Sequence, residues 1–153
     1  MADCSPEKAL VVGVFKRCPI NVQNGKELHA YLFDNAPHVR SFFKGAEHFT
    51  GQMVMESDRC DKHGIRVMTA LHLMALAWAD RNVFENQVWV LVRFHDRFKG
   101  FNDNTDKYAA FWPLLIGFLK TKTELTTEEE KALEAIAADF VATANGALKK
   151  HAP

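Results

Sequence analysis

The sequence predicts a single all-α domain over residues 1–153, with six or more helices. Apolar residues recur mostly at steps of three and four, which is the spacing of a helix that buries one face. Proline, glycine and polar residues interrupt this pattern at short intervals, which favours a compact globule over a long bundle. Strand-like alternation, internal repeats and long linkers are not evident.

Start and stop residues place the helices along the chain. We expect helices over residues 6–18, 22–35, 58–79, 83–97, 106–120 and from 127 onward, with a short turn at 39–43 and turn chemistry at 100–104. Ser5-Pro6-Glu7 provides a cap, a first-turn proline and an acid, as a helix start requires. Pro19 and Pro37 should end the first two helices.

The last two helices carry their own signals. Pro113 lies inside the fifth helix and should kink it or mark an irregular turn. Thr127 and Glu130 have the spacing of a capping box at the start of the last helix.

Composition argues against several classes of partner. Hydrophobic residues make up 48% and charged residues 25% of the chain, as in a folded globular protein. The 19 basic and 19 acidic residues cancel, which argues against a nucleic acid or an anionic membrane. The sequence contains no run of about eighteen apolar residues, which is the length that a helix needs to span a bilayer. The first residues do not form a signal peptide, so we expect a cytoplasmic protein.

The three cysteines, Cys4, Cys18 and Cys60, match no zinc or CxxC spacing. We interpret them as free thiols in a reducing compartment. A redox sensor at Cys60, which lies close before His63, is the alternative interpretation.

Two histidines extend the apolar faces of two consecutive helices. A helix turns about 100° per residue, which places a line of apolar residues on the same side as each histidine. These are Val67, Ala70 and Met74 for His63, and Leu91, Val88 and Phe84 for His95. Antiparallel packing of the two helices would bring both faces together.

Such a pair has two interpretations. A single histidine on an apolar face is ordinarily a core residue bonded to a backbone carbonyl. Two facing histidines would leave polar nitrogens buried among apolar groups, which is unfavourable. A flat apolar cofactor with a metal resolves this problem, and haem needs only one or two axial ligands. Zinc is less favoured because no third and fourth ligands occur at suitable spacing.

At these residues the chain resembles globins, in particular nematode-type globins. Matching motifs occur in the family's order and approximate spacing over nearly the whole chain. They are Leu32-Phe33-Asp34-Asn35-Ala36-Pro37, Phe42-Phe43-Lys44-Gly45-Ala46-Glu47, Asp61-Lys62-His63-Gly64, Arg93-Phe94-His95 and Phe111-Trp112. The resemblance implies a globin fold of about six to eight helices around a pocket for haem b, iron protoporphyrin IX.

The resemblance also implies roles for individual residues. His95 corresponds to the proximal iron ligand, and His63 falls at the distal position, on or near the iron from the other side. Phe43 corresponds to the phenylalanine stacked on the haem, and Val67 to the apolar residue beside the gas site. The other expected cofactor contacts are Arg66, His29, Phe94, Leu91, Tyr108 and Phe111.

The chain departs from the nematode pattern in its distal pocket. Such globins often carry glutamine where this chain has His63, and tyrosine where it has His29. That pair is associated with very tight oxygen binding, which is therefore not predicted here. His29 has two interpretations: a second distal group that donates to the gas or to His63, or a core histidine bonded to protein.

Two glycines stand beside these histidines. Gly25 precedes His29 by one turn, and Gly64 directly follows His63. Glycine inside a helix costs about 1 kcal/mol relative to alanine, so the pair predicts a close approach of the two helices.

Some polar residues are expected outside the pocket. Lys62 and Arg66 should face solvent at the haem edge, where they could pair with propionates, although simple solvation also fits Lys62. His72 should face away from the haem and be structural. The histidines expected at the surface are His38, His48 and His151.

The predicted function is reversible binding of oxygen or another diatomic gas at haem iron. One rival is a six-coordinate, bis-histidyl globin for redox, electron transfer or gas sensing. Another is a peroxidase or nitric-oxide dioxygenase, which would need an external reductase as partner. A haem-free helical interaction protein is the least favoured. We expect a monomer or a homodimer.

Overall fold

The computed structural model describes residues 5–150, which form seven α-helices and three short 3-10 segments. The α-helices are α1 (Pro6–Lys16), α2 (Val22–Asn35), α3 (Gly51–Glu56), α4 (Asp61–Ala77), α5 (Arg81–Phe94), α6 (Asp106–Lys122) and α7 (Thr127–Lys150). The 3-10 segments are η1 (Pro37–Phe42), η2 (His95–Arg97) and η3 (Phe101–Asp103). No strand occurs in this range, so the predicted all-α class is confirmed.

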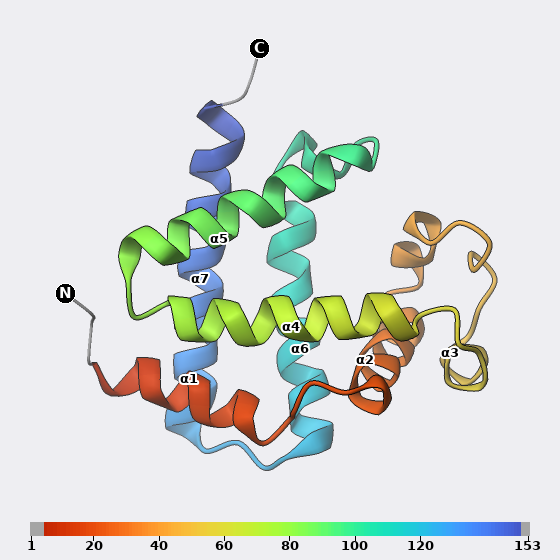
Figure 1. The fold of residues 1–153 in the computed structure, drawn as a ribbon, viewed down its shortest axis with the longest axis horizontal. Coiled ribbons are helices and arrows are strands. Elements are labelled where there is room, and N and C mark those ends of the chain that lie inside the picture. Colours follow the sequence, from red (N-terminus) through yellow and green to blue (C-terminus); the bar gives the residue numbers. More distant parts are fainter. Residues whose placement is uncertain (1–4, 151–153) are drawn as a thin grey trace.

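The helices pack in crossing layers (Figure 1). α4 and α5 lie on the near side with α1 below α4, and α6 and α7 run across them behind. α2 packs against α4 and α6, and α3 packs against α2. The main apolar core includes buried residues of α1, α4, α5, α6 and α7. None of the described helices is long and apolar enough to cross a membrane.

Two predicted helices are shorter in the structure because their ends tighten into single turns. α1 ends at Lys16, and the amide of Cys18 donates to the carbonyl of Phe15 three residues back. α4 begins at Asp61, whose amide donates in the same way to Asp58. Such turns are common at helix ends, where backbone amides and carbonyls lack a hydrogen-bond partner four residues away and bond instead to one three residues away.

The structure corrects the expected end of α5 and one of the two alternatives expected at Pro113, the irregular turn. α5 ends at Phe94 and not near Arg97, because the chain tightens into η2 from His95 onward. α6 continues through Pro113 without an irregular turn. Pro113 lies on the exposed side of α6, where the carbonyl that loses its amide partner can meet water.

Short-range side-chain caps account for one missed helix and one misplaced start. α3 was not predicted, but Thr50 caps it by accepting from the Met53 amide. The capping box of α7 lies one residue earlier than expected. The Glu129 amide donates to Thr126 Oγ1, and the Thr126 amide donates to Glu129 Oε1.

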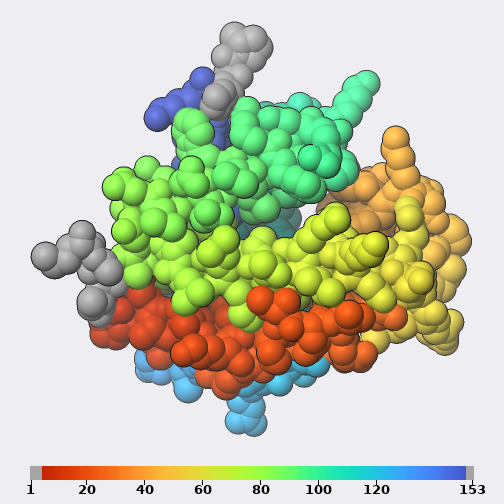
Figure 2. Space-filling model, in the orientation of Figure 1, coloured from red at the N-terminus to blue at the C-terminus, as the bar shows by residue number. Residues whose placement is uncertain are grey.

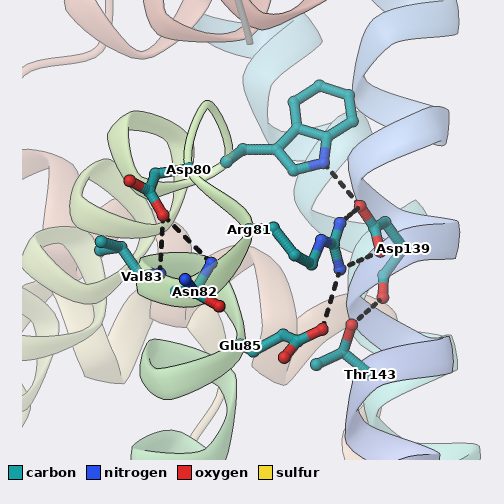
Figure 3. A network of polar contacts seen from close by, with 8 residues as sticks. Asp80, Arg81, Asn82, Val83, Glu85, Asp139 and Thr143 are labelled. Carbon is teal, nitrogen blue, oxygen red and sulfur yellow. Dashed lines mark hydrogen bonds and ion pairs between the residues drawn. The ribbon is translucent and has the colours of Figure 1, made fainter. Parts of the chain in front are cut away.

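A polar network ties α7 to the turn between α4 and α5 (Figure 3). Asp139 of α7 accepts from Trp78 Nε1 at 2.8 Å and from both terminal nitrogens of Arg81. Burial alone would raise the pKa of Asp139, but these hydrogen bonds lower it. The Asp80 side chain caps α5 by accepting from two amides of its first turn. This network fixes the turn that connects α4, which carries His63, to α5, which leads to His95.

Candidate functional site

A partly open apolar cavity of about 430 Å³ lies among α2, α4, α5 and α6. Figure 2 shows a hollow at the surface between α4 (yellow-green) and α5 (green). Most of the lining residues are aliphatic or aromatic. The charged side chains among them are Lys44, Arg59 and Lys107, and no carboxylate lines the cavity. The site therefore suits a large apolar molecule that carries negative charge at its edge.

His95 lies on one wall, where α5 passes into η2. Its Nδ1 is 2.8 Å from the carbonyl oxygen of Leu91, one turn earlier. A carbonyl can only accept, so Nδ1 carries the proton and donates, and Nε2 keeps a lone pair. Burial lowers the pKa of His95, which favours this neutral form. The ring stacks on Phe101 with centroids 4.4 Å apart, which holds its plane.

Asn102 fixes the loop beneath His95. Its Nδ2 donates to the Val92 carbonyl at 2.8 Å and to Asp96 Oδ1 at 2.7 Å. Its Oδ1 accepts from the Tyr108 hydroxyl at 2.7 Å. Asn102 thus links α5, η3 and α6 around His95. The sequence identified this segment only as a turn, because nothing in the local pattern shows which elements the amide bridges.

On the opposite side, α2 and α4 cross with their backbones in contact. A Cβ on Gly25 would lie 2.7 Å from the carbonyl carbon of Gly64, and a Cβ on Gly64 would lie 2.8 Å from that of Gly25. Real Cβ atoms do not approach other atoms so closely, so the predicted role of both glycines is confirmed. The crossing brings His29 and His63 together, because each stands within one turn of its glycine.

The rings of His29, His63 and Phe43 form a three-membered cluster on this wall. His29 and His63 have ring centroids 4.9 Å apart, and each contacts Phe43 edge-on. Burial, together with His29, Arg66 and His95, lowers the pKa of His63 to about 4. Burial also lowers the pKa of His29. Both rings are therefore neutral at neutral pH.

Most of the predicted contacts come together in this cavity. Those that line it are His29, Phe43, His63, Val67, Leu91, His95, Tyr108 and Phe111. Phe94 and Arg66 do not line it. Phe94 is 36% exposed, and its ring lies under the Arg97 guanidinium. Adjacent helical residues differ by about 100° in direction, so Phe94 points away from the cavity that His95 lines. Arg66 lies on the exposed face of α4.

Several lining residues were not predicted as cofactor contacts. Lys44, Arg59 and Lys107 are the cationic side chains among them, and Lys107 also donates to the Gly100 carbonyl. His38 is exposed as expected but also lines the cavity. These residues come from separate loops and helices, so helical periodicity could not group them.

Two other predictions can be compared with the structure. His72 bonds to the carbonyls of Met68 and Phe15 on the side toward α1, which confirms its structural role. Cys18 and Cys60 are free thiols and buried, and Cys60 lines the cavity. Cys4 and His151 lie outside the described residues.

The donor set fits haem. In residues 5–150, no three His, Cys, Asp or Glu side chains gather closely enough to hold a metal ion by themselves. The cavity instead offers the neutral imidazoles of His63 and His95 as candidate iron ligands, together with apolar walls and cationic side chains. Haem needs one or two axial ligands, an apolar slot and partners for its propionates, and the residues present can provide all three.

Known proteins with similar sequences and structures carry the same fold. Residues 26–144 match the sequence model of the globin family. A globin-like protein of Caenorhabditis elegans is 32% identical over 129 residues, covering 84% of this chain and 79% of that protein. A myoglobin of Ascaris suum is 32% identical over 123 residues, covering 80% of each. A solved structure of a globin-like protein from C. elegans has a TM-score of 0.88 and 26% identity, covering 98% of this chain and 96% of that one.

Proposed function

Because the chain belongs to the globin family, we propose that it binds haem b between His95 and His63 and reversibly binds oxygen or another diatomic gas there. One observation carries the proposal. His95 Nδ1 donates to the Leu91 carbonyl, so Nε2 is left with a lone pair on a ring that lines the cavity. Iron-ligating histidines ordinarily have their other ring nitrogen engaged in this way.

The remaining lining residues have complementary roles. Haem, when bound, supplies an iron atom to which a diatomic gas can coordinate. Phe43 and Val67 provide apolar walls that limit the entry of water. The neutral His63 ring offers one N–H as a hydrogen-bond donor to a polar gas. The cationic side chains provide partners for the two propionates.

An absorption spectrum of the full chain, purified with haem, tests this function. We expect a haem band that shifts when the reduced protein meets oxygen or carbon monoxide and returns when the gas is removed. A chain that takes up no haem would contradict the proposal. So would haem that oxidises at once without a reversible complex.

A second candidate is a six-coordinate globin that transfers electrons or senses gas. It is favoured by the neutral state of His63, whose pKa of about 4 leaves a ring nitrogen with a free lone pair at neutral pH. The spectrum of the reduced protein without gas separates the two functions. A five-coordinate spectrum supports gas carriage, whereas a six-coordinate spectrum supports direct ligation by His63.

A further inference from the structure

The proton of His29 is held inside α2. Its Nδ1 lies 2.9 Å from the carbonyl oxygen of Gly25, one turn earlier. The residue is only 1% exposed, and no carboxylate lines the cavity to stabilise a charged ring. A neutral imidazole has a single N–H, and a carbonyl can only accept. The N–H of His29 is therefore on Nδ1 and donates to Gly25.

This tautomer leaves Nε2 of His29 as an acceptor. It cannot donate to a gas unless the bond to Gly25 breaks. The rings packed on His29 are His63, with centroids 4.9 Å apart, and Phe43, at 5.6 Å. Of these two, only His63 has an N–H to give. Because the two rings are in contact, the free acceptor on His29 and the N–H of His63 favour a hydrogen bond between them.

We propose that His29 is a positioning residue that accepts a hydrogen bond from His63 and so competes with a gas for the His63 N–H. The inference rests on the proposed function, because it concerns the donor that a bound gas would meet. Its direction is specific. A hydrogen-bond donor at residue 29 would stabilise a polar bound gas. An acceptor at residue 29 instead weakens the hydrogen bond that His63 donates to the gas.

Nitrogen-15 NMR of the full chain tests the tautomer directly. Couplings from the ring protons show which imidazole nitrogen is protonated, and correlation of the ring protons with the assigned backbone identifies the signals of His29 in the unmodified chain. We expect a protonated Nδ1 and a bare Nε2 for His29. A protonated Nε2 would overturn the proposal. The Gly25 bond lies within α2, so the tautomer is read whether or not the chain holds haem, and a failure of haem binding is seen separately by absorption.

A double-mutant cycle tests the competition. We expect His29→Leu to slow oxygen dissociation by about two- to tenfold, the change that one hydrogen bond ordinarily carries. In a His63→Leu background, the same substitution should have no effect on oxygen dissociation, because the His63 N–H for which His29 and the gas compete is absent. Carbon monoxide dissociation should change less in each case, because carbon monoxide is less polar.

The cycle also separates positioning from other roles. Faster oxygen dissociation in His29→Leu would show that His29 is a donor and overturn the proposal. An equal effect of His29→Leu with and without His63 would show a purely structural role and overturn it as well. His48→Leu is the matched control, because His48 is exposed and does not line the cavity. It should leave oxygen dissociation unchanged. The NMR test uses the unmodified chain, so it holds even if a variant fails to fold.

Discussion

At the scale of single residues, the proximal wall depends on the hydrogen bond between His95 Nδ1 and the Leu91 carbonyl. This bond selects the tautomer, and the stack on Phe101 selects the plane of the ring. Asn102 and Tyr108 then hold the loop against α5. These contacts orient the lone pair of Nε2 before any ligand arrives, which lowers the entropy lost on binding.

We expect His95→Gly to lose most of its haem affinity, because the substitution removes the proximal ligand atom. Added imidazole should restore binding by filling the space that the side chain leaves. Titration of the haem-free variant with haem, with and without imidazole, measures both effects. A variant that keeps haem with an unchanged spectrum would show that His95 is not the ligand.

On the distal wall, we expect His63→Leu to speed oxygen dissociation by about tenfold or more. A hydrogen bond to a group with partial negative charge is worth about 1.5–3 kcal/mol, and His63 is the donor that replacement by leucine removes. Carbon monoxide dissociation should change much less. Stopped-flow measurements with both gases check this, and equal changes for both would argue against hydrogen bonding by His63.

At the scale of helices, the distance between the two distal histidines follows from the crossing of α2 and α4. Gly25 and Gly64 allow this crossing because neither has a side chain to separate the two backbones. The carbonyl of Gly25 lies beside His29 for a different reason, because the two residues are one turn apart in α2. The helix crossing thus sets the spacing of the two rings, whereas the geometry of α2 sets the tautomer of His29.

We expect Gly64→Ala to destabilise the protein by about 1–3 kcal/mol, because the new Cβ would overlap the Gly25 backbone. This loss should exceed the gain of about 1 kcal/mol that alanine ordinarily brings to a helix. Gly13→Ala in α1 is the matched control. A Cβ at Gly13 meets nothing within 4 Å, so that variant should be as stable as the parent or more stable. Denaturant unfolding of both variants gives the comparison, and a Gly64→Ala variant as stable as the parent would refute the contact.

At the scale of the whole molecule, burial of neutral histidines links stability to pH. The pKa values of His29, His63 and His95 are all lowered by burial from an unfolded value of about 6.5. Below that pH the unfolded chain binds protons that the folded chain does not. Acidification from about pH 6.5 toward pH 4 therefore favours unfolding.

We expect the free energy of unfolding of the haem-free chain to fall between pH 7 and pH 5. His63 alone can contribute up to about 1.4 kcal/mol per pH unit below 6.5. The fall should be smaller in His63→Leu. Tryptophan fluorescence during denaturant unfolding reports the change, because Trp78 and Trp112 are buried. Equal stability of the parent chain at the two pH values would contradict the linkage.

The sequence by itself determined the features that depend on residues within one or two helices. Helical periodicity placed His63 and His95 on apolar faces, and two glycines beside the distal histidines marked a close crossing. Proline positions separated α1, α2 and η1. These signals are readable because the residues that carry them lie a few turns apart on one helix, where spacing alone decides which face they share.

Only the tertiary structure decided how separate segments combine. Lys44, Arg59 and Lys107 line the same cavity, although they come from a loop, the approach to α4 and α6. Asn102 bridges three elements, and Phe94 turns out of the cavity. The hydrogen bond from His29 to Gly25 lies within one helix. The ring of His29 is neutral, and so has a single N–H, because His63 of α4 and Phe43 bury it. Burial and charge at a site are sums over neighbours distant in the chain, and the local pattern of one segment does not contain them.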